Sequence, residues 1–270
     1  MKIHRSSATA PAGLPAGRIL IGVVHLPPLP GAPQWAGRFE ELLGHAVRDA
    51  VAYARGGADA VIIENFGDIP FTKDAVPPET VAAMAAAGRA VRAAIPLPIG
   101  FNVLRNDARA ALALCASCGG SFIRVNVHCG AMVTDQGVIE GRAFETLRLR
   151  RQLAPDVQIF ADVHVKHAAP LAPLPIEIAA RDTLERGLAD ALIISGTGTG
   201  TATDLSEVER VRAACPKARI LIGSGITAAS VADYLRAADG VIVGSSLKRN
   251  GRLRDLVDAR RVAALRRAMK

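Results

Sequence analysis

Eight short apolar segments, rich in valine and isoleucine, alternate with longer amphipathic segments from residue 18 onward. The expected strands cover residues 18–24, 58–64, 97–103, 121–127, 157–163, 190–195, 219–224 and 239–244. The expected helices cover residues 40–56, 79–94, 106–118, 142–153, 176–187, 204–214, 227–237 and 252–268. Because the strands are apolar on both faces, they are typical of a parallel sheet covered by helices. Eight such units predict one closed (β/α)8 barrel, and a doubly wound open sheet is the alternative.

The connections after the expected strands are longer than those after the expected helices. They span residues 25–39, 65–78, 128–141, 164–175 and 196–203. Several helix-to-strand connections, by contrast, are only one or two glycines long. Long connections gathered on one face of a barrel carry its functional site. We expect a single barrel domain over residues 18–270. Residues 1–17 have no apolar segment of the kind that a secretory signal needs, so we interpret them as a flexible tail.

Polar residues follow several of these strands, where a barrel would bring them to a common mouth. The candidate catalytic residues are Glu64, Arg124, Asn126, His128, Asp162 and His164. Strand alternation places Arg124, Asn126 and His128 on one side of their strand, and Asp162 and His164 on one side of theirs. Carboxylates and imidazoles are natural acid/base groups, and buried structural ion pairs are the alternative.

Two further interpretations of these residues stay open. Glu64, His128, Asp162 and His164 include the ligand types that hold a divalent metal, although their spacing does not require one. Lys166 is a candidate Schiff-base amine, but its place three residues beyond a strand end favours solvent. His25, which ends the first expected strand, also belongs to this face.

Glycine turns with hydroxyl residues follow the last three expected strands. Glycines let backbone N–H groups approach an anion, and barrels bind phosphate at this place. The candidate phosphate-binding residues are Gly196, Thr197, Gly198, Thr199, Gly223, Ser224, Gly225, Gly244 and Ser245. Lys248 would add a full positive charge. Tight turns without a ligand are the alternative.

The net charge of +8 is concentrated near the C-terminus, between residues 248 and 270. This pattern indicates a last helix with a solvated basic face, or weak contact with an anionic membrane surface. Only 4% of residues are aromatic, which argues against nucleic acid as a partner. The four cysteines do not form a secreted framework, so we expect a cytoplasmic protein with packed, reduced thiols.

Six segments of the chain resemble the BtpA family: residues 22–33, 56–71, 122–141, 159–171, 194–205 and 220–227. The resemblance implies a TIM barrel of the phosphate-binding type. One photosynthetic branch of the family helps photosystem I proteins accumulate as a peripheral thylakoid protein. Other members occur without a photosystem, often beside genes of sugar or nucleoside metabolism. The resemblance implies no catalytic residue.

Together these features predict an enzyme that acts on a small phosphorylated metabolite, either a sugar phosphate or a nucleoside-derived compound. Acid/base chemistry would serve isomerase, lyase or glycosyl-transfer reactions. The alternative is a non-catalytic assembly factor at the membrane surface, of the photosystem I biogenesis type. Barrels of this kind commonly associate, so we expect a homo-oligomer.

Overall fold

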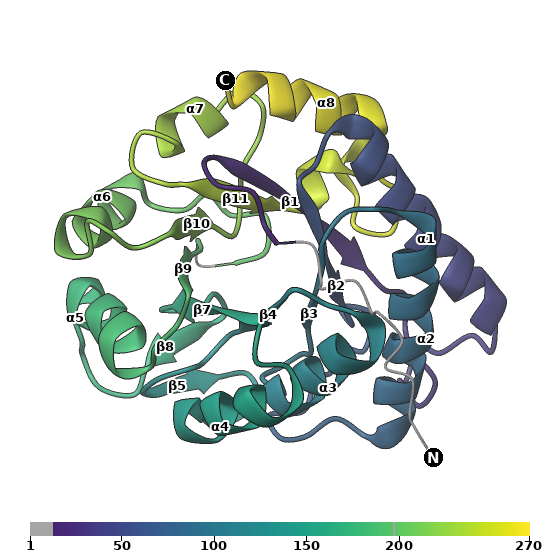
Figure 1. Cartoon of the computed structure of the whole chain (residues 1–270), viewed down its shortest axis with the longest axis horizontal. Helices are drawn as coiled ribbons and strands as arrows, with labels where there is room; N and C mark the ends of the chain where they lie inside the picture. Colours follow the sequence, from purple (N-terminus) through teal and green to yellow (C-terminus); the bar gives the residue numbers. More distant parts are fainter. Residues whose placement is uncertain (1–12, 197) are drawn as a thin grey trace, which may run out of the picture.

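The computed structural model describes residues 13–196 and 198–270, and within them eight parallel strands close into a barrel (Figure 1). Neighbouring strands follow the order β1-β11-β10-β9-β7-β4-β3-β2. The barrel strands are β1 (Ile19–His25), β2 (Ala60–Glu64), β3 (Ile99–Asn102), β4 (Phe122–Val125), β7 (Gln158–Val163), β9 (Ala191–Ile194), β10 (Ile220–Ile222) and β11 (Gly240–Val243). The predicted barrel is confirmed, and closure excludes the open doubly wound sheet.

Helices form the outer ring of the barrel in Figure 1. They are α1 (Phe39–Gly56), α2 (Pro78–Ala94), α3 (Ala108–Cys118), α4 (Ala143–Leu153), α5 (Ile176–Arg181), α6 (Leu205–Ala214), α7 (Val231–Tyr234) and α8 (Ala259–Ala268). A π-helical turn, η1 (Asp182–Arg186), extends α5. Two short 3-10 turns, η2 (Ser245–Leu247) and η3 (Arg249–Gly251), separate β11 from α8.

Two helices are shorter than the sequence pattern predicts. The expected helix 227–237 is reduced to α7, because the backbone N–H of Thr227 donates to the hydroxyl of Ser230 and forms a local turn instead. The expected helix 252–268 begins only at Ala259. Asp258 caps it by accepting a hydrogen bond from the N–H of Arg260.

An apolar cluster fills the interior of the barrel below the level of its polar residues. It contains Ile21, Ile62 and Ile193, together with Phe122 and Phe160, whose rings stack 4.9 Å apart. A larger cluster lies between the strands and the helices. Since the lower barrel is packed with apolar side chains, polar chemistry is confined to the ends where the strands finish.

The connections after β4 and β7 form structure that the sequence pattern did not predict. Within the described residues they make a three-stranded antiparallel sheet in the order β6-β5-β8. Its strands are β5 (Ala131–Thr134), β6 (Gly137–Glu140) and β8 (Ala168–Pro170). Met132 and Ile139 pack on Val127 and Val165, so this sheet fixes both connections beside the barrel mouth.

The two ends of the barrel domain meet on the face opposite this sheet. Arg18, which precedes β1, donates to the carbonyl oxygens of Met269 and Lys270 at 3.4 and 3.3 Å. Leu14 packs against the interior cluster. The first twelve residues of the expected tail lie outside the described residues.

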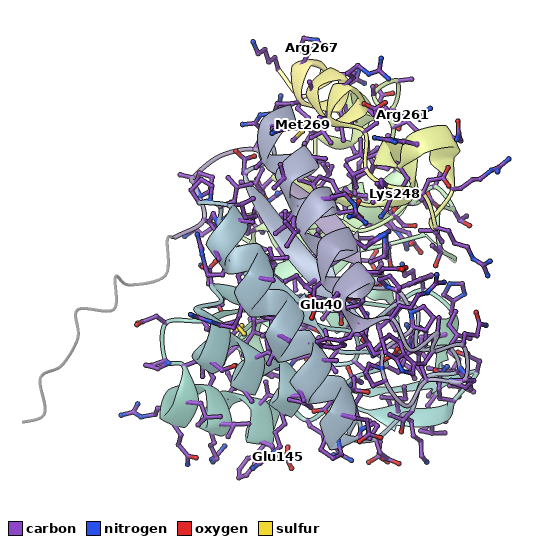
Figure 2. The ribbon with its side chains drawn as sticks, turned by 90° about the vertical axis from the view of Figure 1, so that its right-hand side faces the viewer. Glu40, Glu145, Lys248, Arg261, Arg267 and Met269 are labelled. Atoms are coloured by element: carbon purple, nitrogen blue, oxygen red, sulfur yellow. The ribbon has the colours of Figure 1, made fainter. Side chains whose placement is uncertain are left out.

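The C-terminal helix covers the barrel with one face and exposes its basic residues on the other. Val262 and Leu265 are buried, and α8 approaches α1 so closely that a Cβ on Gly56 would meet the Cβ of Val262. Arg261 and Arg267 are exposed on the outer side of α8 (Figure 2). In the described part of the chain, no helix combines the length and hydropathy needed to cross a membrane.

Candidate active site

Two adjoining cavities occupy the face where the barrel strands end. The first, which we call the glycine-side cavity, has a volume of about 440 Å³ and lies among the turns that follow β9, β10 and β11. The second, the aromatic-side cavity, has a volume of about 630 Å³ and extends over Phe66 and Phe71. Both cavities are lined by the same four residues: Glu64, Arg124, Lys166 and Thr199. We refer to the two cavities together as the mouth.

Arg124 and Asp162 form a buried ion pair between β4 and β7. Arg124 donates from Nε and Nη2 to the two carboxylate oxygens of Asp162, each at 2.8 Å. Asn126 adds a third hydrogen bond to Asp162, at 3.2 Å. Burial disfavours the charge of Arg124, but the attraction and hydrogen bonds of Asp162 outweigh it and raise the pKa of the guanidinium. Asp162 therefore fixes Arg124 as a permanent positive charge in the mouth.

Glu64 is buried at the end of β2, at the same level as His25 and Asn102 on the neighbouring strands. Its carboxylate accepts a hydrogen bond of 2.9 Å from Asn102. Burial alone would raise the pKa of Glu64. His25, Lys166, Arg124 and the Asn102 hydrogen bond outweigh that effect and lower the pKa. Glu64 is therefore an anion at neutral pH and a candidate general base.

His25 ends β1 in the glycine-side cavity. Burial, opposed by the charge of Glu64, lowers the pKa of His25 to about 4, so the imidazole is neutral at pH 7. The ring packs against the edge of Phe66 at 5.0 Å. A Cβ on Gly244 would lie 2.4 Å from Cε1 of His25, so the approach of this ring requires the glycine.

Lys166 turns into the mouth rather than toward solvent. It is flanked by His164 and His167, whose φ angles of 51° and 57° are left-handed, and this geometry redirects the chain after β7. Arg105 holds the backbone by donating to the Lys166 carbonyl at 2.6 Å. Desolvation, followed by the charge of Arg124, lowers the pKa of Lys166. The expectation that Lys166 faces solvent is wrong, and the sequence pattern misled because a loop residue has no fixed alternation.

The glycine turns line the glycine-side cavity as a group. Its wall includes Thr199, Gly223, Ser224, Gly225, Gly244 and Ser245. Gly225 has a left-handed φ of 68°, and a Cβ there would lie 2.4 Å from the Cα of Ala202. Among the described residues, the backbone N–H groups of Gly225 and Ser245 have no hydrogen-bond partner. Two free donors in a concave wall suit an anion.

Other members of the expected anion site have different surroundings. Gly196 packs against the backbone of Thr201, and Gly198 lies near His167; neither lines the mouth. The Ser224 hydroxyl donates to the Gly198 carbonyl at 3.0 Å, so it braces the turn after β9. Thr197 lies outside the described residues.

Lys248 does not reach the anion site. Its ammonium is fully buried in an ion pair with Asp49 of α1, and Asp49 also accepts a hydrogen bond of 2.8 Å from the N–H of Val257. The interpretation of Lys248 as a phosphate ligand is wrong, because this pair anchors the segment between β11 and α8 instead.

His128 and His164 do not join Glu64 at the mouth. The barrel strand β4 ends at Val125, so its alternation does not continue to His128, which donates from Nε2 to the carbonyl of Gly187 at 2.8 Å. His164 has a left-handed backbone and lines a side cavity of about 340 Å³, together with the candidates Asn126 and Asp162. Within residues 13–196 and 198–270, no three histidine, cysteine or acidic side chains gather to hold a metal.

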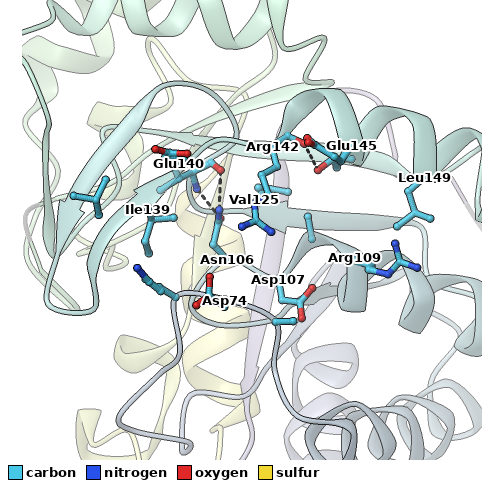
Figure 3. Close-up of a pocket in the computed structure, with 16 residues that line it drawn as sticks. Asp74, Asn106, Asp107, Arg109, Val125, Ile139, Glu140, Arg142, Glu145 and Leu149 are labelled. Atoms are coloured by element: carbon cyan, nitrogen blue, oxygen red, sulfur yellow. Dashed lines mark hydrogen bonds between the residues drawn. The ribbon is translucent and has the colours of Figure 1, made fainter.

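A further cavity of about 520 Å³ lies outside the mouth, between α3, α4 and β6 (Figure 3). Two of its polar side chains hold neighbouring backbone in place. Asp107 accepts hydrogen bonds from the N–H groups of Ala110 and Val76, each at 2.9 Å. Asn106 bonds both the N–H and the carbonyl of Val127, as the dashed lines in Figure 3 show.

The model of the BtpA family matches residues 17–270. The chain belongs to the BtpA family. It is 47% identical to the photosystem I biogenesis protein BtpA of a Synechocystis species, over 93% of this chain and 87% of that protein. It is also 43% identical to an uncharacterized protein of Pyrococcus furiosus, over 91% of this chain and 92% of that one.

Two solved structures with the same architecture carry the names of enzymes. Thiamine phosphate pyrophosphorylase from Pyrococcus furiosus has a TM-score of 0.56 and 15% identity, covering 93% of this chain and 95% of that one. Phosphoribosyl anthranilate isomerase from Thermus thermophilus has a TM-score of 0.55 and 15% identity, covering 93% and 98%. At this identity the likeness shows the TIM-barrel fold alone.

Proposed function

We propose that this chain is an enzyme that acts on a small phosphorylated metabolite, a sugar phosphate or a nucleoside-derived compound, by acid/base chemistry in the mouth. One observation carries the proposal. The unpaired N–H groups of Gly225 and Ser245 lie in the wall of the same cavity as Glu64, His25 and Lys166.

The turns after β10 and β11 would hold the phosphate. Their backbone N–H groups would donate to phosphate oxygens, and the left-handed Gly225 lets this turn pack against Ala202, where a Cβ would not fit. Arg124 supplies positive charge from the cavity floor. Binding the phosphate anchors the substrate, so that its reacting carbon lies deeper in the mouth.

The reacting end would meet three titratable groups. Glu64 is an anion that can accept a proton, His25 is neutral, and desolvation lowers the pKa of the Lys166 amine. Asp162 and Asn126 act through Arg124, which they hold in place. His128 and His164 have no part in this proposal.

The fold comparisons support the proposal at the level of architecture. Both enzymes described above are named for phosphorylated compounds, and they share the barrel without close sequence relationship. The same barrel face therefore suits a phosphorylated ligand in this chain.

The test is binding of inorganic phosphate. We expect phosphate to raise the melting temperature by mass action, and a crystal grown in phosphate to show the anion on the N–H groups of Gly225 and Ser245. Chloride at equal ionic strength is the control. A melting temperature that responds equally to both salts would remove the anion site from the proposal.

A homo-oligomer in the cytoplasm accompanies this proposal. Exposed apolar side chains on α4 and on the connection after β8, including Phe144, Leu153 and Leu171, offer contact area for a second copy. The described cysteines are free, and burial raises the pKa of Cys115, which suits a reducing compartment. Light scattering after gel filtration measures the oligomeric state.

A second function, assembly at a membrane surface, is favoured by one relative and one surface. The Synechocystis relative is named as a photosystem I biogenesis protein, and α8 exposes Arg260, Arg261 and Arg267. Flotation with vesicles of anionic lipid tests this function. Binding that is unchanged when these three arginines become glutamine would exclude α8 as the contact.

A further inference from the structure

Lys166 stands at the junction of the two mouth cavities. It lines the glycine-side cavity, which holds the proposed phosphate site, and the aromatic-side cavity, which has room for the rest of a substrate. With the phosphate bound in the glycine-side cavity, a side chain at this junction lies beside substrate atoms a few bonds away from that phosphate. The loop backbone on both sides of Lys166 is left-handed at non-glycine residues, which is the strain expected where a loop must place one side chain.

No carboxylate in the described part of the chain forms an ion pair with Lys166. The two nearest acids are already engaged. Asp162 accepts two hydrogen bonds from the guanidinium of Arg124, and Glu64 accepts one hydrogen bond from Asn102. Arg124 also opposes a second positive charge beside it. The mouth thus holds an amine that no salt bridge commits to the ammonium form.

We infer that Lys166 forms a Schiff base with the carbonyl carbon of a phosphorylated aldehyde or ketone whose phosphate lies on the turns of Gly225 and Ser245. This inference rests on the proposed function and narrows its substrate class to carbonyl compounds.

The covalent step needs no reactant beyond the substrate. The amine nitrogen of Lys166 attacks the carbonyl carbon, a C–N bond forms, and the π electrons of the C=O bond move onto oxygen. The nitrogen then passes one proton to that oxygen through the carboxylate of Glu64, which leaves a neutral carbinolamine. The second nitrogen proton follows the same route to the departing oxygen as the next bond breaks. The C–O bond breaks, water leaves with its electron pair, and the nitrogen lone pair completes the C=N bond. Glu64 ends the step as a carboxylate, as it began.

Chemical trapping with pyridoxal 5′-phosphate tests the inference, because this probe carries an aldehyde and a phosphate. The full-length protein is incubated with the probe, sodium borohydride reduces any imine to a stable secondary amine, and peptide mass spectrometry locates the adduct among the six lysines. Pyridoxal, which lacks the phosphate, is the matched probe. Lys73→Arg, which alters a lysine outside the mouth, is the matched control for Lys166→Arg.

We expect the adduct on Lys166, at least about tenfold more of it with pyridoxal 5′-phosphate than with pyridoxal, because the anchored phosphate adds binding energy. The adduct should be lost in Lys166→Arg, kept in Lys73→Arg, and suppressed by inorganic phosphate. Phosphate binding by Lys166→Arg, seen as a raised melting temperature, shows that this variant is folded.

The contrary outcomes separate the two proposals. If phosphate binds but Lys166 stays unlabelled while exposed lysines react, the Schiff base is overturned and the phosphate site stands. If Lys166 reacts equally with both probes and phosphate does not compete, the amine stands and the phosphorylated substrate is overturned.

Discussion

The guanidinium of Arg124 and the carboxylate of Asp162 join β4 to β7 through two parallel hydrogen bonds of 2.8 Å inside the barrel. Both side chains are almost wholly buried, so neither charge can return to water if its partner is removed. Stability and the charge of the mouth therefore depend on the same pair.

Replacing Asp162 by asparagine keeps the shape but leaves the Arg124 charge unpaired. We expect the free energy of unfolding to fall by about 3 kcal/mol, as measured by urea denaturation. Asp233→Asn, which breaks the exposed Arg236–Asp233 pair, is the control and should cost at most about 0.5 kcal/mol. Equal effects in the two variants would show that the buried pair is dispensable.

Gly225→Ala should weaken anion binding. The new Cβ would be forced against the Cα of Ala202, so the turn must shift and its N–H moves away from the cavity. We expect inorganic phosphate to bind about tenfold more weakly, as measured by titration calorimetry. Gly119→Ala is the control, since Gly119 also has a left-handed φ, 71°, but lies at the end of α3 with open space at its Cβ. That variant should lose about 1 kcal/mol of stability and keep the native phosphate affinity.

His128→Ala should affect stability without affecting the mouth. The variant loses the hydrogen bond to the Gly187 carbonyl, which costs about 1 to 2 kcal/mol of unfolding free energy. Because His128 lines neither mouth cavity, we expect the dissociation constant for phosphate to stay within about twofold of native. A larger loss of affinity would place His128 in the site after all.

Acidification should destabilise the fold in the pH range where His25 titrates. The pKa of His25 is about 4 in the folded protein and about 6.5 when unfolded, so the unfolded chain binds the proton more readily. The free energy of unfolding therefore decreases as pH falls from about 6.5 to about 4, by roughly 3 kcal/mol from this residue. Urea denaturation at several pH values measures the slope.

His25→Gln should reduce that slope, since the substituted side chain takes up no proton in this range. Burial also lowers the pKa of His128 and of His164, so part of the slope remains in the variant. A direct check is the proton resonance of the His25 ring: titration near pH 6.5 in the folded protein would contradict the buried neutral imidazole.

The barrel could be predicted from the sequence because its strands are short, mostly apolar segments that alternate regularly with amphipathic helical segments. The three-stranded sheet could not, since β5, β6 and β8 are only three or four residues long and most of their residues are not buried. Short, partly exposed strands have no periodicity to detect. The shortening of α7 depends on one hydroxyl contact of Ser230, which the apolar pattern does not report.

Candidate site residues inside strands could also be placed from the sequence, whereas those in the loops could not. Residues inside regular strands, such as Glu64, Arg124 and Asp162, lie where alternation put them. His128, His164 and Lys166 lie beyond the strand ends, where backbone dihedrals decide the direction of a side chain and alternation no longer applies. The ion pair of Lys248 could not be predicted either, because its partner Asp49 is distant in the sequence.

The contact of Arg18 with the last two residues has a practical consequence for handling the protein. Arg18 and the C-terminus lie at the end of the barrel away from the mouth, so a purification tag or a surface tether at the C-terminus leaves the mouth clear. The same adjacency should let a short linker join the ends and new ones be cut in an exposed loop, giving a circularly permuted barrel.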